Sequence, residues 1–347
     1  MKKKYIRSQS RRKTPWDGLS EEERTPLQSF LRNLYIEQFD YHHQSLATMN
    51  DSSVLDQYTP ADCPYCGSVK FVRNGHYKST GLQRYTCTDC HQSFCITTGT
   101  IFEDHKISIG EWMQYLLNLF DYVSLNADSK NNKNSFTTSR YWLQKVFLVL
   151  ESYQDSTVLS GKVYLDETYW SERKSDLERN KDGFLLRGIS RNQICIATAA
   201  DKKCIYCKVE GNGKPSSEGI LRVFKGHIKP HATLIHDGEH AHESLVEALK
   251  LKEEVHLSEE MKGLKDADNP LDRINNIHAF LSWFLRAHSS FMRTNLNGYL
   301  NLFAFIMNPP HDKLKKVEIF LELAIKSRVT LKYRDFYKKH QDEDLLE

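Results

Sequence analysis

The sequence predicts a multidomain α/β protein in which a small cysteine-rich domain and a helical segment precede a larger domain built on a mixed sheet. Three observations support this. Two Cys-x-x-Cys pairs are separated by twenty residues, two amphipathic helical patterns follow them, and short strand-like runs then alternate with helical ones. With 347 residues, 39% of them hydrophobic, the chain is long enough for two or three packed domains.

The two cysteine pairs have the spacing of a tetrahedral zinc site. Each Cys-x-x-Cys turn presents two thiolates to one ion, and the gap between the pairs accommodates a hairpin. We expect Cys63, Cys66, Cys87 and Cys90 to bind one structural Zn2+ in a zinc ribbon, because so small a domain has too little core to fold unaided. The ribbon is either a structural spacer or a nucleic-acid contact. The hairpin side chains that favour the second role are His76, Lys78, Arg84 and Tyr85.

Apolar residues recur at helical spacing from Ser108 to about Tyr122, and again from about Thr137 to Tyr153. We expect a helix over each range, with a polar break between them. Two interpretations stand: a packed helical linker, or a helix-turn-helix that reads a DNA groove. Because Thr137, Thr138 and Ser139 cap or open the second helix, we expect Arg140, Gln144 and Lys145 on its outer face.

Two aspartates, Asp166 and Asp237, each follow an apolar run of strand type, VYL and TLIH respectively. The runs predict that each carboxylate lies at the end of a buried strand, which is how a sheet presents acids to a metal ion. Glu167 follows directly and should point to the opposite face of its strand. His236, His240 and His242 crowd the turn around Asp237, where they are either structural, in contact with DNA, or proton carriers.

The elements around these two aspartates occur in a characteristic order. We expect strands over 193–199 and 204–209, helices over 216–225 and 242–250, a short strand over 254–257, and a long helix over 271–287. Together with the strand before Asp166 and the strand before Asp237, this order matches a ribonuclease-H-like domain. In such a domain carboxylates from two neighbouring strands and a later helix converge on divalent metal ions.

The later helix begins near Leu271 and contains no glutamate. A third oxygen ligand is needed there, because two carboxylates leave much of a metal shell unfilled. Asn275 and Asn276 each offer an amide oxygen, and Asp272 lies one turn earlier on a similar face. Glu239, two residues after Asp237, is a further candidate from the residues alone.

Several segments between about Tyr58 and Met307 carry a more specific pattern. They are CPYC, CTDC with the following FCITTGTIFEDHKI, VYLDETYW, RGISRNQICIATAAD, GNGKPSSEGIL, TLIHDGEHAH and RINNIHAFL. In these segments the chain resembles bacterial insertion-sequence transposases of the 1595 family, which join a zinc ribbon to a DDE-type, ribonuclease-H-like domain. The resemblance implies a DNA transposase that uses Mg2+ or Mn2+ to cleave DNA and to transfer the freed strand.

The family's first two acids match Asp166 and Asp237. Its third acid is glutamate in many members, but one branch has asparagine in an NNxH-like setting that matches the segment NNIH here. The resemblance therefore implies Asn275 as the third ligand, with Asn276 close behind. The family pattern also has a lysine seven residues after the ligand. This chain has Ser282 there, and Arg286 is the nearest basic residue in the helix.

The resemblance implies double-stranded DNA as partner, both as terminal inverted repeats and as target, and a homo-oligomer assembled on DNA. Two rival functions remain: a catalytically inactive or repurposed DNA-binding protein derived from a transposase, and a metal-dependent nuclease without strand transfer. The first thirteen residues carry seven basic side chains and no acidic one, which is typical of either a disordered arm or a phosphate contact. Without an apolar run of membrane-spanning length or an apolar signal region, we expect a cytoplasmic, nucleoid-associated bacterial protein with no membrane partner.

These patterns divide the chain into five expected segments. They are a basic arm and helical amino-terminal segment over 1–55, a zinc ribbon over 56–105, a helix-turn-helix-like segment over 106–155, a ribonuclease-H-like DDE-type domain over 156–310, and a carboxy-terminal helix with an acidic tail over 311–347.

Overall fold

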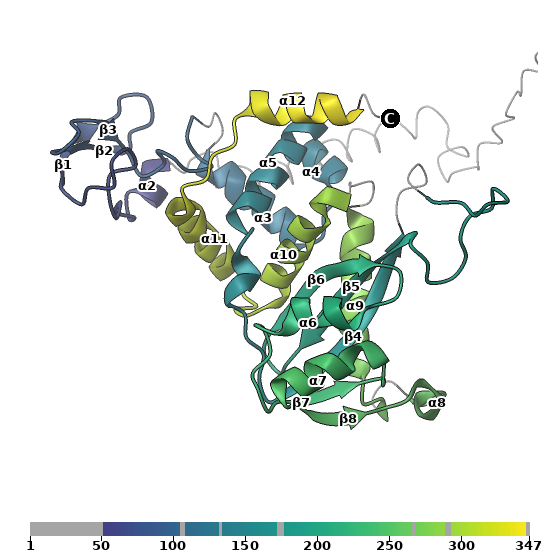
Figure 1. Cartoon of the computed structure of the whole chain (residues 1–347). Coiled ribbons are helices and arrows are strands. Elements are labelled where there is room, and N and C mark those ends of the chain that lie inside the picture. Colours follow the sequence, from purple (N-terminus) through teal and green to yellow (C-terminus); the bar gives the residue numbers. More distant parts are fainter. Residues whose placement is uncertain are drawn as a thin grey trace, which may run out of the picture.

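The computed structural model describes residues 51–104, 108–131, 134–171, 177–265, 268–288 and 293–344 (Figure 1). The expected basic arm therefore lies outside the described residues, and of the segment 1–55 only helix α2 (Asp51–Leu55) falls within them. Among the described helices, none combines the length and the apolar character that crossing a membrane requires.

The cysteine-rich domain is a small antiparallel sheet of β1 (Phe71–His76), β2 (Gln83–Cys87) and β3 (Ser93–Phe94). Its core is three aromatic rings, Phe71, Tyr85 and Phe94, whose centroids lie 5.5 to 5.7 Å apart. Tyr85 is only 4% exposed, so the expectation that it contacts nucleic acid is wrong. Its ring is needed to fill a core that has few other apolar side chains.

Helices α3 (Ile109–Phe120) and α5 (Phe136–Val149) form where the apolar spacing predicts them. Ser108 and Glu111 form a capping box at the start of α3, which satisfies backbone N–H groups of the first turn. A further short helix, α4 (Leu125–Asn131), occupies part of the expected polar break. Asp128 of α4 is buried and accepts hydrogen bonds from Asn118 and Ser139, which tie α4 to both longer helices.

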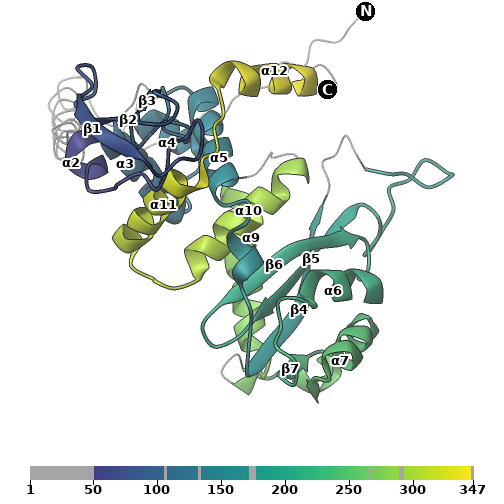
Figure 2. The same ribbon diagram turned by 60° about the vertical axis from the view of Figure 1, so that its left-hand side comes forward.

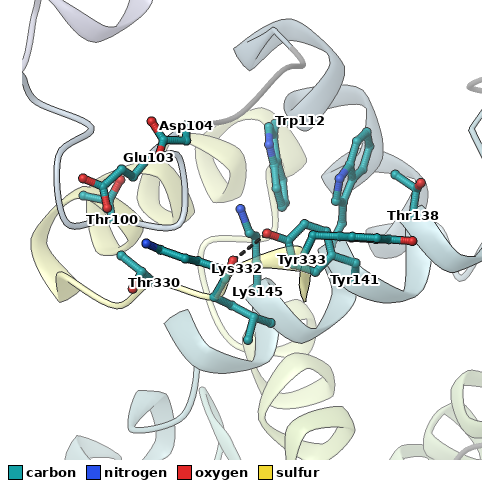
Figure 3. Close-up of a pocket in the computed structure, with 12 residues that line it drawn as sticks. Thr100, Glu103, Asp104, Trp112, Thr138, Tyr141, Lys145, Thr330, Lys332 and Tyr333 are labelled. Atoms are coloured by element: carbon teal, nitrogen blue, oxygen red, sulfur yellow. Dashed lines mark hydrogen bonds between the residues drawn. The ribbon is translucent and has the colours of Figure 1, made fainter. Parts of the chain in front are cut away.

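Lys145 on α5 does not face solvent, so the outward position expected for it is wrong. The side chain is buried, and its Nζ donates a hydrogen bond to the carbonyl of Ile101 at 2.5 Å. Burial lowers the pKa of Lys145 to about 8. Figure 3 shows it beside a cavity of about 450 Å³ between α3, α5 and the segment 330–333. Because this part of α5 is covered, the helix does not present Lys145 to a DNA groove.

The carboxy-terminal part of the chain completes the helical body around α3 and α5. It contributes α10 (Leu296–Met307), α11 (Lys313–Ser327) and α12 (Tyr333–Asp344). After residue 311, where a single helix with an acidic tail was expected, the structure has the two helices α11 and α12. α11 packs against α3 and α5, and α10 packs against α5 and the large sheet. Segments distant in sequence thus lie side by side in one helical layer (Figure 1).

The larger domain is built on a mixed five-stranded sheet with the order β6-β5-β4-β7-β8. β5 runs antiparallel to β4 and β6, whereas β7 runs parallel to β4 and β8. The strands are β4 (Lys162–Ser171), β5 (Gln193–Ala200), β6 (Ile205–Asn212), β7 (Thr233–His236) and β8 (Lys252–Val255). The expected α/β class with a mixed sheet is confirmed, although β8 begins two residues earlier than the sequence predicts.

Helices cover both faces of this sheet, as Figure 2 shows. α6 (Ser217–Phe224) and α7 (Glu243–Leu249) pack on one face, and α9 (Asp272–Ala287) and α10 lie on the other. Side chains alternate along each strand, so Leu165 and Leu234 belong to the first face while Tyr164 and Ile235 belong to the second. The described residues also include the short helical turns η2 (Tyr153–Ser156), η3 (His240–His242), α8 (Ser258–Met261) and η5 (Arg293–Asn295).

Candidate metal centres

The two aspartates lie on neighbouring parallel strands. Asp237 directly follows β7, as the sequence predicts. Asp166 lies in the middle of β4 and not at its end, because the strand continues through the β-forming residues Thr168, Tyr169 and Trp170. In the register between the strands Tyr164 pairs with Ile235. Continuing that register by two residues sets Asp166, on the face of the sheet that α9 covers, level with Asp237, which lies just beyond the end of β7.

The surroundings of Asp166 disfavour its charged form. Burial, followed by the negative charges of Glu167 and Asp237, raises the pKa of Asp166 to about 7, although the backbone N–H of Glu167 donates to its Oδ1 at 2.8 Å. The carboxylates therefore repel one another in a partly desolvated place. A divalent cation relieves this repulsion, so the donor set fits a metal ion that prefers oxygen ligands.

Replacing Asp166 by asparagine should stabilise the protein at alkaline pH when no Mg2+ is added. The pKa of about 7 in the folded chain exceeds the ordinary aspartate value of 3.8, so between about pH 4 and 7 the folded chain retains a proton that the unfolded chain has released. Stability therefore falls as the pH rises through this window. The cost above pH 7 is on the order of 4 kcal/mol, and Asp166→Asn removes it.

Thermal unfolding at pH 5 and pH 8 measures this effect. We expect the Asp166→Asn variant to unfold several degrees above the wild type at pH 8, with a smaller difference at pH 5. Mg2+ should raise the unfolding temperature of the wild type more than that of the variant. Asp182→Asn, in an exposed loop, is the control and should leave both values unchanged. A variant less stable than the wild type at pH 8 would contradict the assignment.

Helix α9 brings His278 to the first aspartate. Its Nδ1 lies 3.6 Å from Oδ2 of Asp166, and burial lowers the pKa of His278 to about 4. The ring is thus neutral at pH 7, so the contact is not an ion pair despite its short distance. Asn275 precedes His278 by one helical turn and shares its side of α9, where it is exposed. Asn276 instead donates its amide to Asp272 at 2.8 Å.

Glu167 points to the opposite face of β4, as predicted. Its carboxylate lies 3.0 Å from Nε2 of His242, at the start of α7. Of the three crowded histidines, His236 and His242 are buried, which excludes direct contact with DNA for both, whereas His240 is exposed and pairs with Glu243. Sequence reasoning missed the partners of these buried rings, because they come from two other strands, β4 and β8.

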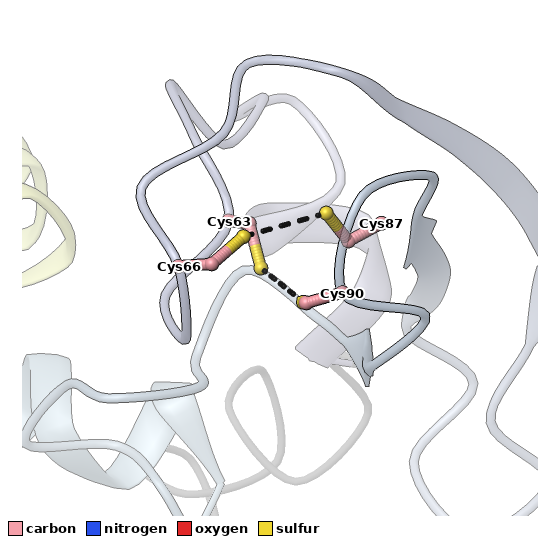
Figure 4. Close-up of side chains that lie close together, drawn as sticks. All are labelled: Cys63, Cys66, Cys87 and Cys90. Atoms are coloured by element: carbon pink, nitrogen blue, oxygen red, sulfur yellow. Dashed lines mark hydrogen bonds between the residues drawn. The ribbon is translucent and has the colours of Figure 1, made fainter.

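The four ribbon cysteines turn their sulfur atoms toward one another (Figure 4). The Sγ atoms of Cys63 and Cys90 lie 3.6 Å apart, as do those of Cys66 and Cys87. A tetrahedral zinc ion with Zn–S bonds of about 2.3 Å requires sulfur atoms about 3.8 Å apart. Backbone N–H groups of Cys90 and Asp89 lower the pKa of Cys87 to about 7, whereas the neighbouring thiols raise the pKa values of Cys66 and Cys90, so Cys87 is the thiol of this set that most readily forms the thiolate. The geometry fits the Zn2+ predicted for these residues.

Comparison with known proteins gives one curated relative. The chain is 28% identical, over 123 residues, to an uncharacterized protein in the transposable element ISH50 of Halobacterium salinarum. The matched part covers 34% of this chain and 40% of the relative's length. No family model matches the chain.

Two solved structures overlap with the chain at low TM-scores. The catalytic domain of the Mos1 mariner transposase gives a TM-score of 0.26 at 10% identity, covering 55% of this chain and 93% of that domain. The Mos1 mariner paired end complex with Mn also gives 0.26, at 12% identity, covering 62% and 77% respectively. At these TM-scores the overlaps support no conclusion about this chain. Along the 34% of its length that this match covers, the chain is thus similar to a protein of a transposable element.

Proposed function

We propose that this chain is a DNA transposase of the 1595 insertion-sequence family with a ribonuclease-H-like catalytic domain. One observation carries the proposal: Asp166 and Asp237 come level on adjacent parallel strands, in a partly desolvated place beside α9. The strand order and the helices on both faces of the sheet agree with that domain type. The similarity to a transposable-element protein supports the same reading.

In this proposal Asp166, Asp237 and Asn275 hold Mg2+ or Mn2+. Bound ions of this kind activate water or a 3′ hydroxyl for attack and stabilise the charge of the pentavalent phosphate. Asp166 contributes its carboxylate only when it is deprotonated, and the ion favours that form. Asn275 adds a neutral amide oxygen, so the three-residue set carries about two negative charges where a glutamate-bearing set has three. The DNA phosphate then completes the coordination.

DNA is the proposed partner, as terminal inverted repeats and as target, bound by a homo-oligomer. His76 and Lys78 are exposed on the ribbon and remain available for phosphate contact. Arg286 lies eleven residues after Asn275 on the same face of α9, about 16 Å further along the helix, and is exposed. We assign to Arg286 the phosphate contact that Ser282, at the position of the family's lysine, cannot make.

A DNA-binding protein without catalysis is the second candidate, because α9 has Asn275 where many family members have glutamate and Ser282 where the family pattern has lysine. A strand-transfer assay separates the candidates. It uses the full chain, Mg2+ or Mn2+, and DNA carrying the ends that flank its gene. Transfer of the 3′ end to target DNA supports the transposase, cleavage without transfer supports a nuclease, and binding alone supports the repurposed protein.

Asn275→Ala should reduce cleavage of such ends by roughly 100-fold, because it removes one metal ligand without changing the charge of the site. Asn275→Glu should be tolerated and should lower the Mg2+ concentration needed for half-maximal cleavage. Asn276→Ala is the matched control, since its amide is bonded to Asp272. Cleavage rates measured at several Mg2+ concentrations test the expectations for both variants. If Asn275→Ala cleaves normally, the third ligand is Asn276, Asp272 or Glu239.

A further inference from the structure

Two buried histidines, His236 and His242, meet on the face of the sheet opposite α9. Their Nδ1 atoms are 2.9 Å apart, and the side chains are 3% and 0% exposed. Asp237, half-buried at the end of β7, offers a carboxylate oxygen that lies within 4.8 Å of one ring nitrogen of each histidine. Two imidazoles and one carboxylate therefore converge on a single point.

The outer nitrogen of each ring faces a carboxylate. Nε2 of His242 lies 3.0 Å from Oε1 of Glu167, and Nε2 of His236 lies 3.4 Å from Oε1 of Glu253. A carboxylate only accepts hydrogen bonds, so His242 carries a proton on Nε2, whereas Nε2 of His236 makes no hydrogen bond in the structure. The backbone N–H of Gly238, at 3.3 Å from Nδ1 of His236, agrees with a lone pair on that nitrogen.

At 2.9 Å the two Nδ1 atoms are within hydrogen-bond distance of each other, and a metal ion would take the place of the proton that they share. Histidines that bind metals usually direct the other ring nitrogen to a carboxylate, which fixes the tautomer and the orientation of the ring. Glu167 and Glu253 occupy those outer positions here. The cluster therefore has the inner and outer groups of a metal site.

We propose that His236, Asp237 and His242 bind a divalent transition-metal ion. Imidazole nitrogens favour first-row transition ions over Mg2+. With metal–nitrogen bonds of about 2.1 Å, nitrogens 2.9 Å apart subtend an angle of about 90° at the ion. That angle suits six-coordinate Mn2+ better than tetrahedral Zn2+.

The site concerns metal binding alone and stands whether or not the chain transposes DNA. Asp237 belongs both to this ligand set and to the one proposed for catalysis. Asp166 belongs only to the catalytic set, and the two histidines belong only to this one. Variants of Asp166 on one side, and of His236 and His242 on the other, therefore distinguish the two sites.

Pulsed electron paramagnetic resonance with Mn2+ alone tests the proposal on the full-length, zinc-loaded chain without DNA. We expect modulation from directly coordinated imidazole ¹⁴N in the wild type, and its replacement by the ¹⁵N pattern after ¹⁵N-histidine labelling. Asp166→Asn should keep this signal. His236→Gln and His242→Gln should lose it, with Mn2+ affinity at this site reduced roughly 10-fold or more. His240→Gln, on the same turn but exposed, is the matched control and should behave as the wild type.

Three outcomes would overturn the site: no nitrogen modulation from Mn2+ bound to the wild type, modulation that persists in the variant lacking both buried histidines, or its loss in His240→Gln. The wild-type measurement decides the question even if a histidine variant fails to fold. Circular dichroism identifies such a failure.

Discussion

Asp166→Asn and Asp237→Asn are each expected to abolish metal-dependent cleavage of the element's DNA ends, with a loss of at least about 1,000-fold. Both residues supply charged ligands to the same ion in this proposal, and asparagine replaces a carboxylate by a neutral amide of similar size. DNA binding should persist, because neither residue anchors the duplex. Cleavage of labelled end DNA, measured beside a binding titration, tests both parts.

The control for this experiment is Asp182→Asn, which removes an exposed carboxylate far from β7 in sequence and should cleave as the wild type does. Raised Mn2+ should restore part of the activity of Asp166→Asn, because its site retains Asp237 and Asn275. Undiminished cleavage by either aspartate variant would remove that residue from the ligand set. A wild type that binds authentic ends but leaves them intact would favour the repurposed DNA-binding protein.

Removing zinc should unfold the ribbon. Its core consists of three aromatic rings and the buried cysteines, too little apolar surface to offset the entropy of ordering a domain of this size. Structural zinc in small domains contributes about 10 kcal/mol or more of apparent binding free energy. X-ray absorption of the reduced wild type should show one zinc with four sulfur neighbours. Cys87→Ser combined with Cys90→Ser should lose that environment and become sensitive to proteolysis within 56–104.

The matched control is Cys204→Ser, from the other Cys-x-x-Cys pair of the chain, whose thiol lies at the edge of the large sheet. It should keep the zinc environment and the protease resistance of the wild type. Unfolding should also reach the helical body locally, because Arg328, just after α11, donates to the backbone carbonyls of Asp62 and Cys63. A folded, reduced protein without a four-sulfur zinc signal would contradict the prediction.

Much of the fold and part of the site follow from local sequence patterns. The Cys-x-x-Cys spacing predicts the cluster because a tight turn fixes two thiolates without help from the rest of the chain. Apolar runs predict β5 and β6, which contribute buried side chains to both cores, and helical periodicity predicts α6 and α9, each of which turns one face to a core. The alternation of side chains along a strand places Glu167 on the face opposite Asp166. The order of the elements then indicates which strands carry the two aspartates.

Only the tertiary structure decides what covers each predicted face. The register between β4 and β7 brings Asp166 level with Asp237, and it depends on backbone hydrogen bonds between residues some seventy positions apart in sequence. Burial of Lys145 and Tyr85 follows from packing partners that periodicity does not reveal. His236 and His242 meet because a turn returns the chain under the sheet, where β4 and β8 supply their carboxylates. Local pattern thus determines the elements and the cysteine cluster, whereas long-range packing determines which side chains share a site.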